Sequence, residues 1–355
     1  MISSLAVAAF LSLGSSGAQL GEQVQRVESF GSIQEYLEDP GRPLPPDANS
    51  TSLAQLSSGA TPGALHVGVY VLSITDINLR ENSFTSEFYV STRWDQRGGE
   101  NPSDHLRVLN GISNSDIGRF DLVSSTTADE VEWRLYLVRS PIFYAWVLPD
   151  YPFDKQLLSI RLGLGDPLQR HVALISDRES SYVHPELVLY DWQIGALDIL
   201  ESHQSVVGTL AIPELSAAVL FLPTVDVLIR MQRRGHLEIV PSFLGYFLAI
   251  GLCVLALAIK ANRNDLVLAG VVAAAGNSIY LAQLLPVSAL SGFSGQIQVI
   301  VYVGVVYTAI ADELIDHLSS SDQNVTSWVF QSALLPVYLA ATLLSIWLAL
   351  PSRGA

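Results

Sequence analysis

Six side chains at helical spacing could line a path for ions in the C-terminal half of the chain. They are Asp265, Ala269, Val272, Gly276, Ile279 and Gln283. Successive members are 4, 3, 4, 3 and 4 residues apart, which places all six on one face of a helix. This set, the Asp265 face, is acidic at one end, small or apolar in its middle and polar at the other end. If the segment were repeated around an axis, the carboxylate would form a ring, and carboxylate rings select cations in membrane pores.

A second face of the same segment has the same spacing and competes with the first. This set, the Asn264 face, consists of Asn264, Leu268, Val271, Ala275, Ser278 and Ala282. A further alternative is that the small residues from Ala273 to Gly276 serve close helix packing in a membrane and line no pore. The carboxylate of Asp265 favours the Asp265 face.

The loop at Trp146–Gln156 has a large apolar residue next to a charge. Pro152 fixes its own φ angle and so stiffens the turn. Phe153 at a loop tip is costly to expose unless it inserts against another element. Asp154 follows it, and Arg233 ends the last predicted strand, just before the first apolar segment. A carboxylate and a guanidinium at such a junction can form a charge-assisted pair, although two unrelated surface charges would look the same in the sequence.

The motifs of several enzyme classes are missing from the sequence. It has no His-Glu-x-x-His zinc motif, no Gly-x-Ser-x-Gly nucleophile motif and no phosphate-binding loop. The single cysteine, Cys253, rules out an intrachain disulfide. Asp312, Glu313, Asp316 and His317 cluster near the end of an apolar segment, where a solvated helix end is a simpler interpretation than a divalent-ion site. We therefore expect no enzyme, no resident metal and no cofactor.

Charge and apolar residues are segregated along the 355 positions. The formal net charge is −15, yet 49% of the residues are hydrophobic. Only 5 of the 34 acidic and 3 of the 19 basic residues lie within 239–355, so the first part is acidic and soluble and the rest is apolar. The acidity argues against a nucleic-acid partner, because phosphate binding needs a surplus of Lys and Arg. It is compatible with attraction of cations to the surface.

The periodicity of the sequence changes near residue 235. Phe84–Asp95 alternates apolar and polar residues, and Val131, Trp133, Leu135 and Leu137 repeat the apolar pattern, which is typical of strands. Residues 63–235 therefore predict a β-sandwich of the immunoglobulin-like kind. Residues 236–351 predict a transmembrane bundle of four helices, since four apolar segments are each long enough to cross a bilayer. These segments are residues 237–259, 265–285, 296–318 and 327–350.

The N-terminal residues indicate the compartment. Residues 1–18 resemble a signal peptide, with an apolar stretch and small residues at its end, although the usual basic residue is missing. Residues 19–62 predict a short helix at Gly21–Asp39 and a linker rich in Pro, Ser and Gly. Lys260 and Arg263, in the first short connection, suit a cytoplasmic side, whereas Arg233 and Arg234, before the first apolar segment, oppose this assignment. The signal peptide therefore decides the predicted orientation. We expect a multi-pass protein of the cell (inner) membrane with its N-terminal domain outside or periplasmic.

Several motifs resemble those of the pentameric ligand-gated ion channels, the Cys-loop receptor superfamily. Trp-Val-Leu-Pro-Asp-Tyr-Pro-Phe-Asp-Lys-Gln at Trp146–Gln156 is similar to the family loop that carries Tyr/Phe-Pro-Phe-Asp-x-Gln. Two cysteines close that loop in animal members, and Tyr144 and Leu158 stand in their places here, as in the prokaryotic type without the disulfide. Arg93–Arg97 resembles the family's Trp-x-Asp or Trp-Asp strand motif. The resemblance covers about Gly63–Leu350 and implies that residues 63–235 form an extracellular ligand-binding domain.

One motif departs from the family pattern. Asp116–Asp121 stands where the family has Asp-Ile-Trp-x-Pro-Asp, with Gly118 and Phe120 in place of the Trp and the Pro. The aromatic residues that hold amine agonists are also missing, since Ser124 and Ser125 occupy one such place. Tyr182 and His203 remain as candidate ligand-binding residues. The agonist therefore stays open between a small molecule, a proton and a divalent ion.

The resemblance implies a homopentamer in the lipid bilayer, with the second apolar segment innermost and monovalent cations passing through. Counting back from Pro286, as in that family, selects the Asp265 face as pore-lining. Phe153, Asp154, Arg233 and Pro286 would form the gating interface, with Phe153 docked within Val287–Gly295. Val272 and Ile279 would form apolar rings that close the pore.

Two other functions remain open. One is a non-conducting membrane sensor of the same fold, which the small residues of the second apolar segment would allow. The other is a membrane-anchored β-sandwich hydrolase, which would need a catalytic motif and a single anchor instead of four apolar segments.

Overall fold

The computed structural model describes residues 63–95, 100–112, 118–165, 172–207, 219–259, 262–320 and 324–350. The predicted signal peptide (1–18) and the predicted helix and linker (19–62) lie outside the described residues. The remaining order is a run of strands followed by helices, so the change of period near residue 235 marks the boundary between the two kinds of structure.

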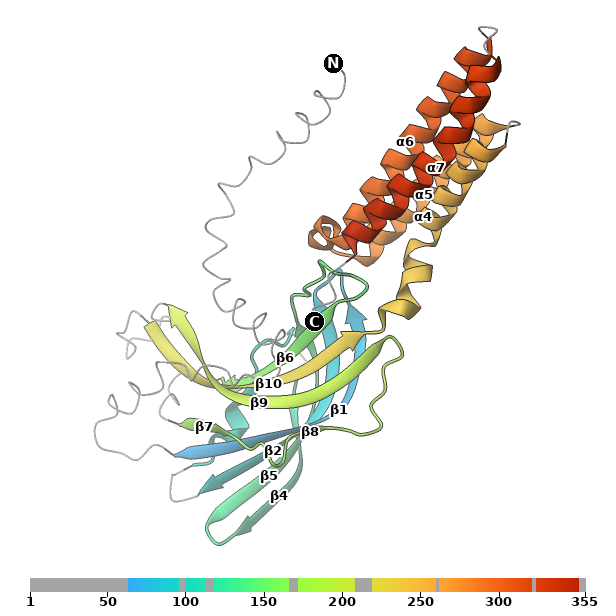
Figure 1. The fold of residues 1–355 in the computed structure, drawn as a ribbon. Coiled ribbons are helices and arrows are strands. Elements are labelled where there is room, and N and C mark those ends of the chain that lie inside the picture. The colour runs from blue at the N-terminus through green and yellow to red at the C-terminus, as the bar shows by residue number, and fades with distance from the viewer. Residues whose placement is uncertain are drawn as a thin grey trace. The chain divides into compact units, whose positions relative to one another are not determined.

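The described strands form two sheets (Figure 1). The first has the order β4-β5-β2-β1-β7, with β8 also paired to β1. Its strands are β1 (Ala64–Asn78), β2 (Ser83–Asp95), β4 (Phe120–Ala128), β5 (Val131–Phe143), β7 (Ala173–Ser176) and β8 (Tyr182–Val183). The second has the order β3-β6-β10-β9, with β3 (Leu106–Val108), β6 (Lys155–Leu164), β9 (Trp192–Val207) and β10 (Val219–Arg233). A short 3-10 helix, η4 (Pro102–His105), precedes β3.

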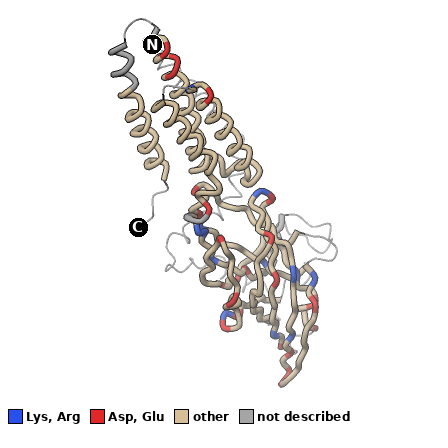
Figure 2. Tube along the Cα trace, turned by 90° about the vertical axis from the view of Figure 1, so that its right-hand side faces the viewer, with Lys and Arg blue, Asp and Glu red and all other residues tan. Residues whose placement is uncertain are grey.

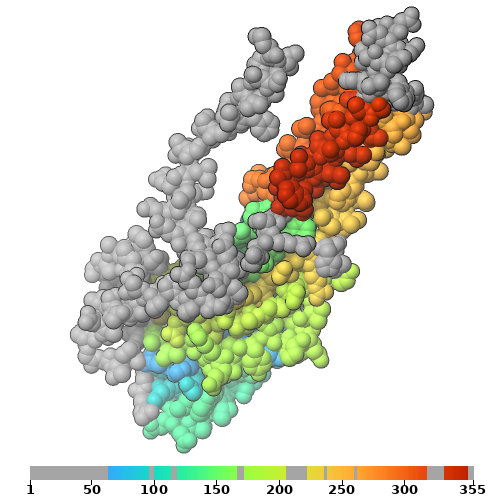
Figure 3. Space-filling view, viewed as in Figure 1, coloured from blue at the N-terminus to red at the C-terminus, as the bar shows by residue number. Residues whose placement is uncertain are grey.

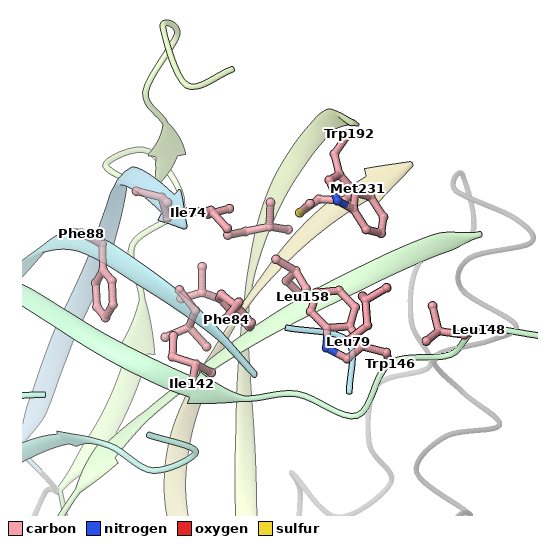
Figure 4. Packing of buried hydrophobic residues seen from close by; sticks show 14 of the residues in the cluster. Ile74, Leu79, Phe84, Phe88, Ile142, Trp146, Leu148, Leu158, Trp192 and Met231 are labelled. Carbon is pink, nitrogen blue, oxygen red and sulfur yellow. The ribbon is translucent and has the colours of Figure 1, made fainter. Parts of the chain in front are cut away.

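The two sheets share one hydrophobic core. In β2 the alternate residues from Phe84 to Trp94 are all buried, as the period of two predicts. Figure 4 shows Phe84 and Ile142, from the first sheet, in one cluster with Leu158, from the second. Buried apolar area of this kind is the main term that stabilises a β domain.

The inward face of β5 differs from the prediction. The apolar residues Val131, Trp133, Leu135 and Leu137 were expected to face the core, but the buried residues of β5 include Tyr136 and Val138. The register explains this, because Val138 lies opposite Phe88, and residues opposite one another point to the same side of a sheet. Trp133 is consequently 41% exposed on the outer face of the first sheet.

Four helices among the described residues are long and apolar enough to cross a membrane (Figure 1). They are α4 (Gly235–Ala258), α5 (Arg263–Leu284), α6 (Phe293–Ser320) and α7 (Asn324–Ala349). A 3-10 helix, η6 (Val287–Ser291), connects α5 to α6. Each helix begins two or three residues before the predicted segment, because helical hydrogen bonding continues through polar end turns that hydropathy does not mark.

The charged residues of these helices lie near their ends. Figure 2 shows the helices almost entirely without Lys, Arg, Asp or Glu along their middles. In the arrangement of the bundle, α5 packs against α4 and α6, whereas α7 packs against α6 and α4. Figure 3 shows α7, in red, forming much of the visible face of the bundle. Helix α5, which carries the Asp265 face, and helix α7 therefore occupy different positions in the bundle.

Candidate functional site at helix α5 and the domain junction

One side of α5 is buried against the other helices and the opposite side is open. The buried residues are Arg263, Gly270, Ala274, Asn277 and Leu281. All six members of the Asp265 face are exposed in the single chain, with Val272 at 64% and Ile279 at 61%. The structure thus places the Asp265 face away from the chain's own bundle.

The Asn264 face is less open than the Asp265 face. With 3.6 residues per turn, the Asp265 face is centred about 150° around α5 from the buried side, and the Asn264 face about 110°. Ala275 and Ser278 of the Asn264 face are partly buried. The Ser278 hydroxyl lies 3.0 Å from the hydroxyls of both Tyr246 and Tyr302, so this residue serves contacts within the bundle. The geometry favours the Asp265 face as the surface that α5 offers to a partner or to water.

Arg263 turns away from Asp265. Its guanidinium is buried, donates from Nε to the Ile259 carbonyl over 2.9 Å, and lies 3.6 Å from Asp312 Oδ1 on α6. Asp265 is exposed on the other side of α5, since two positions along a helix are about 200° apart. The neighbouring arginine is therefore compensated by Asp312, which leaves the carboxylate of Asp265 as the charged group on its face.

A buried ion pair lies at the end of the β domain, beside the start of α4. Arg233, the last residue of β10, donates from Nε to Asp154 Oδ1 over 2.8 Å. Gln156 Nε2 donates to the other carboxylate oxygen over 2.8 Å. The guanidinium also stacks over two rings, with Cζ 4.0 Å from the centroid of Trp192 and 5.0 Å from that of Tyr151. The structure brings together the two charges that the sequence suggested as a pair.

Phe153 lies against the start of α6. Its ring centroid is 5.8 Å from that of Phe293, which in turn lies 5.9 Å from Phe243 on α4. The backbone joins the same two segments, because Phe293 N donates to the Pro149 carbonyl over 2.7 Å. Pro286 caps η6, at the start of the connection that leads to this contact. Phe293 lies within the stretch Val287–Gly295 that was predicted to receive Phe153.

Tyr151 makes a second link to the helices that the sequence analysis missed. Its hydroxyl is 2.8 Å from Ser242 Oγ on α4, and its carbonyl accepts from Ser294 Oγ on α6 over 3.3 Å. The side chain is fully buried, and this burial raises the pKa of Tyr151 to about 12. The residue stays neutral at physiological pH and can both donate and accept. Its place in the same loop as Phe153 and Asp154 was the only signal in the sequence.

A pocket of about 930 Å³ opens beside this junction. Its lining includes the turn after β1, Trp192 and Arg233 from the β domain, and Glu238, Tyr280 and Gln283 from α4 and α5. Gln283 therefore belongs both to the Asp265 face and to the wall of the pocket. The pocket is therefore lined in part by the C-terminal end of α5.

The two candidate ligand-binding residues, Tyr182 and His203, lie on different sheets. Tyr182, on β8 in the first sheet, lies beside Tyr70 and His184, with centroids 4.7 Å apart for the two tyrosines. His203 is exposed on β9 in the second sheet, opposite Pro223. Among the described residues, no group of three His, Cys, Asp or Glu side chains is placed to hold a metal ion. The junction and α5, rather than Tyr182 and His203, form the connected site.

No protein-family model matches the chain, and no curated protein matches it.

Proposed function

We propose that the chain is one subunit of a homopentameric ligand-gated ion channel that prefers cations. The observation that carries the proposal is the Asp265 face of α5, which is exposed along its whole length in the single chain and lies nearly opposite the buried side of that helix. In the proposed pentamer the α5 helices surround the axis, and each subunit contributes one carboxylate to a ring.

The composition of the Asp265 face supports water rather than lipid as its surroundings. A lipid-facing surface gains from large apolar side chains, and α7 exposes such a set: Leu343, Leu344, Trp347 and Leu348. The Asp265 face also exposes Val272 and Ile279, but it includes a carboxylate, an amide and a glycine. Asp265 and Gln283 stand near the two ends of α5, and both would be solvated beside an aqueous path.

Neighbouring β domains would also meet in the pentamer. The outer face of the first sheet exposes Trp133 and Tyr182, which suits contact with another subunit. In the proposed arrangement the β domain is an immunoglobulin-like sandwich outside the cell or in the periplasm, and the Asp265 end of α5 is cytoplasmic. The protein then belongs to the cell (inner) membrane.

Gating would pass through the junction. The Asp154–Arg233 pair and the Phe153–Phe293 contact connect the β domain to the first turns of α4 and α6. A ligand, a proton or a divalent ion that shifts the β domain would move these helix ends, and through Pro286 and η6 the end of α5. The proposal assigns Val272 and Ile279 to apolar rings that stop ions by dewetting when the path is narrow.

A non-conducting sensor of the same fold is the second candidate. It is favoured by the small residues Gly270 and Ala274, which α5 uses to pack closely inside the bundle. A helix can be rich in small residues for that reason alone.

Planar-bilayer recording of the purified protein separates the two candidates. The channel predicts discrete currents whose open probability changes with pH, divalent ions or a small-molecule agonist. A protein that assembles in particle images as a pentamer but stays silent in the bilayer under all these conditions supports the sensor. Dimers or tetramers in mild detergent would contradict the pentamer itself.

A further inference from the structure

A side-chain amide on α5 makes two hydrogen bonds to the backbone of one turn of α4. Asn277 Oδ1 accepts from the Gly245 N–H over 2.9 Å, and its Nδ2 donates to the Ser242 carbonyl over 3.1 Å. Asn277 is buried, and both of its polar ends are used. A carboxamide can substitute for a peptide group in this way, because it has a donor and an acceptor at the same spacing. We call this arrangement the Asn277 clamp.

The clamp lies just after a proline in α4. Pro241 has no N–H, so the hydrogen bond from position 241 to the carbonyl four residues earlier is missing, and the clamp holds the residues that follow, Ser242 and Gly245. Gly245 permits the close approach of α5, since a Cβ there would lie 2.7 Å from the Asn277 Cβ and 2.8 Å from the Ala273 carbonyl oxygen. Gly245 therefore makes this turn of α4 accessible to a side chain from α5.

The clamped residue Ser242 is also the one that the β domain holds. Its side-chain oxygen contacts the Tyr151 hydroxyl at 2.8 Å, while its carbonyl accepts from Asn277. A continuous chain of hydrogen bonds thus runs from the loop of the β domain to α5 through one residue of α4. It bypasses the Phe153–Phe293 contact and the connection between α5 and α6.

The clamp differs from the neighbouring polar contacts of Ser278, because it alone involves Ser242. Ser278, the next residue, bonds to Tyr246 and Tyr302 side chains and to the Ala274 carbonyl of its own helix. None of those contacts involves Ser242 or the β domain. Asn277 alone among these residues connects α5 to the residue that Tyr151 holds.

We propose that Asn277 is a positioning residue that transmits the position of Tyr151 to α5 through Ser242. The role in opening a pore rests on the proposed channel function, whereas the mechanical link between Tyr151 and α5 does not. When Tyr151 releases Ser242, the turn of α4 after Pro241 relaxes and the clamped α5 moves with it.

The first test measures the clamp itself in the full-length protein in lipid nanodiscs. Hydrogen–deuterium exchange of the peptide around Gly245 should speed up roughly fivefold in Asn277→Leu, as expected for the loss of one net hydrogen bond. Asn277→Asp keeps an acceptor for the Gly245 N–H and should show a smaller increase. Equal exchange in the wild type and Asn277→Leu would overturn the clamp.

The second test measures transmission with a readout that stability alone does not move. A cysteine replaces Gln283 in a Cys253→Ala background, and its modification rate by a cationic methanethiosulfonate reagent reports the position of α5. Tyr151→Phe and Ser242→Ala should each change this rate severalfold, and combining them should add nothing. Neither change should have an effect when Asn277 is leucine, because the link is already broken.

Tyr144→Phe is the matched control. Tyr144 is also a tyrosine beside the Trp146–Gln156 loop, but its hydroxyl bonds to Gln156 and to Leu157 N within the β domain. Its removal should leave the modification rate of residue 283 unchanged. Two results would overturn the proposal. In one, Tyr151→Phe changes the modification rate of residue 283 equally whether residue 277 is asparagine or leucine. In the other, it changes the rate in neither background.

Bilayer recordings of the same variants separate this inference from the proposed function. A silent wild type with intact coupling between Tyr151 and Asn277 would contradict the channel and leave the link standing. A conducting wild type with additive effects would contradict the link and leave the channel standing.

Discussion

The Arg233 guanidinium donates to Asp154 over 2.8 Å, and less than a tenth of either side chain is exposed. Arg233 ends β10 and stands two residues before α4, while Asp154 immediately precedes β6. A pair buried at this place fixes the strand end against the loop that carries Phe153. It also places two charges where neither can be solvated if the other is removed.

We therefore expect strong coupling between these two residues. Asp154→Asn or Arg233→Gln alone should lower the free energy of unfolding by about 3–5 kcal/mol, since each leaves an uncompensated buried charge. The double variant should be less destabilised than the sum of the two. Thermal or denaturant unfolding in detergent measures the cycle, and strictly additive losses would contradict a direct pair.

A surface pair provides the control for this cycle. Arg119 and Asp121 lie 3.5 Å apart with 82% and 70% of their side chains exposed. Removing either charge there should change the unfolding free energy by less than about 1 kcal/mol.

The β domain should lose stability in acid at an identifiable cluster. A hydrogen bond from Asn101 holds the pKa of Glu132 below its usual value, and one from Arg134 does the same for Asp104. Because both pKa values are lowered in the folded state, their contribution is present above the ordinary carboxyl pKa and is lost as the pH falls through the folded-state values. Glu132→Gln should lower the melting temperature at neutral pH and have little effect in strong acid.

The pH dependence of the melting temperature measures this prediction, with Asp121→Asn as the exposed-carboxyl control. A constant difference between the wild type and Glu132→Gln at every pH would show that the loss is not electrostatic.

The proposed gate depends on which side chain of α5 faces the axis. Val272→Ser should give a channel that leaks or opens more readily, because a hydroxyl wets the apolar ring. Val271→Ser is the matched control, since the same substitution there lies on the less open Asn264 face. Single-channel open probability in the absence of agonist measures both. If Val271→Ser leaks and Val272→Ser does not, the pore-lining face is displaced by one residue.

Much of the architecture could be predicted from the sequence because it depends on local patterns. The period of two in β2 and the long apolar segments follow directly from which residues avoid water. The inward face of β5 could not be predicted, since it depends on its register with β2 and not on its own apolar residues. Trp133 looked like a core residue and lies on the outer face.

The site was predictable to a similar degree. Asp154 and Arg233 stand at predicted element ends, the resemblance of the Trp146–Gln156 loop to the channel family favoured their pairing, and the structure brings them together. The partner of Arg263 was not foreseen, because Asp312 is far along the chain and looked like one of several solvated acids. Asn277 and Ser242 gave no signal, since a buried polar residue in a helix is recognised only when its partners are known.

The central claim, that α5 lines a cation-selective path with Asp265 at its charged end, is tested most directly by reversal potentials. In planar bilayers with a KCl gradient, the wild type should reverse near the potassium equilibrium potential. Asp265→Asn should move the reversal potential toward zero, because a carboxylate about 4 Å from an ion contributes roughly 4 kcal/mol before screening at an effective dielectric constant of about 20. Glu313→Gln removes an exposed carboxylate of α6 near the same end of the bundle as Asp265, and it should leave the reversal potential unchanged. A wild type that prefers chloride, or an Asp265→Asn channel as cation-selective as the wild type, would contradict the account.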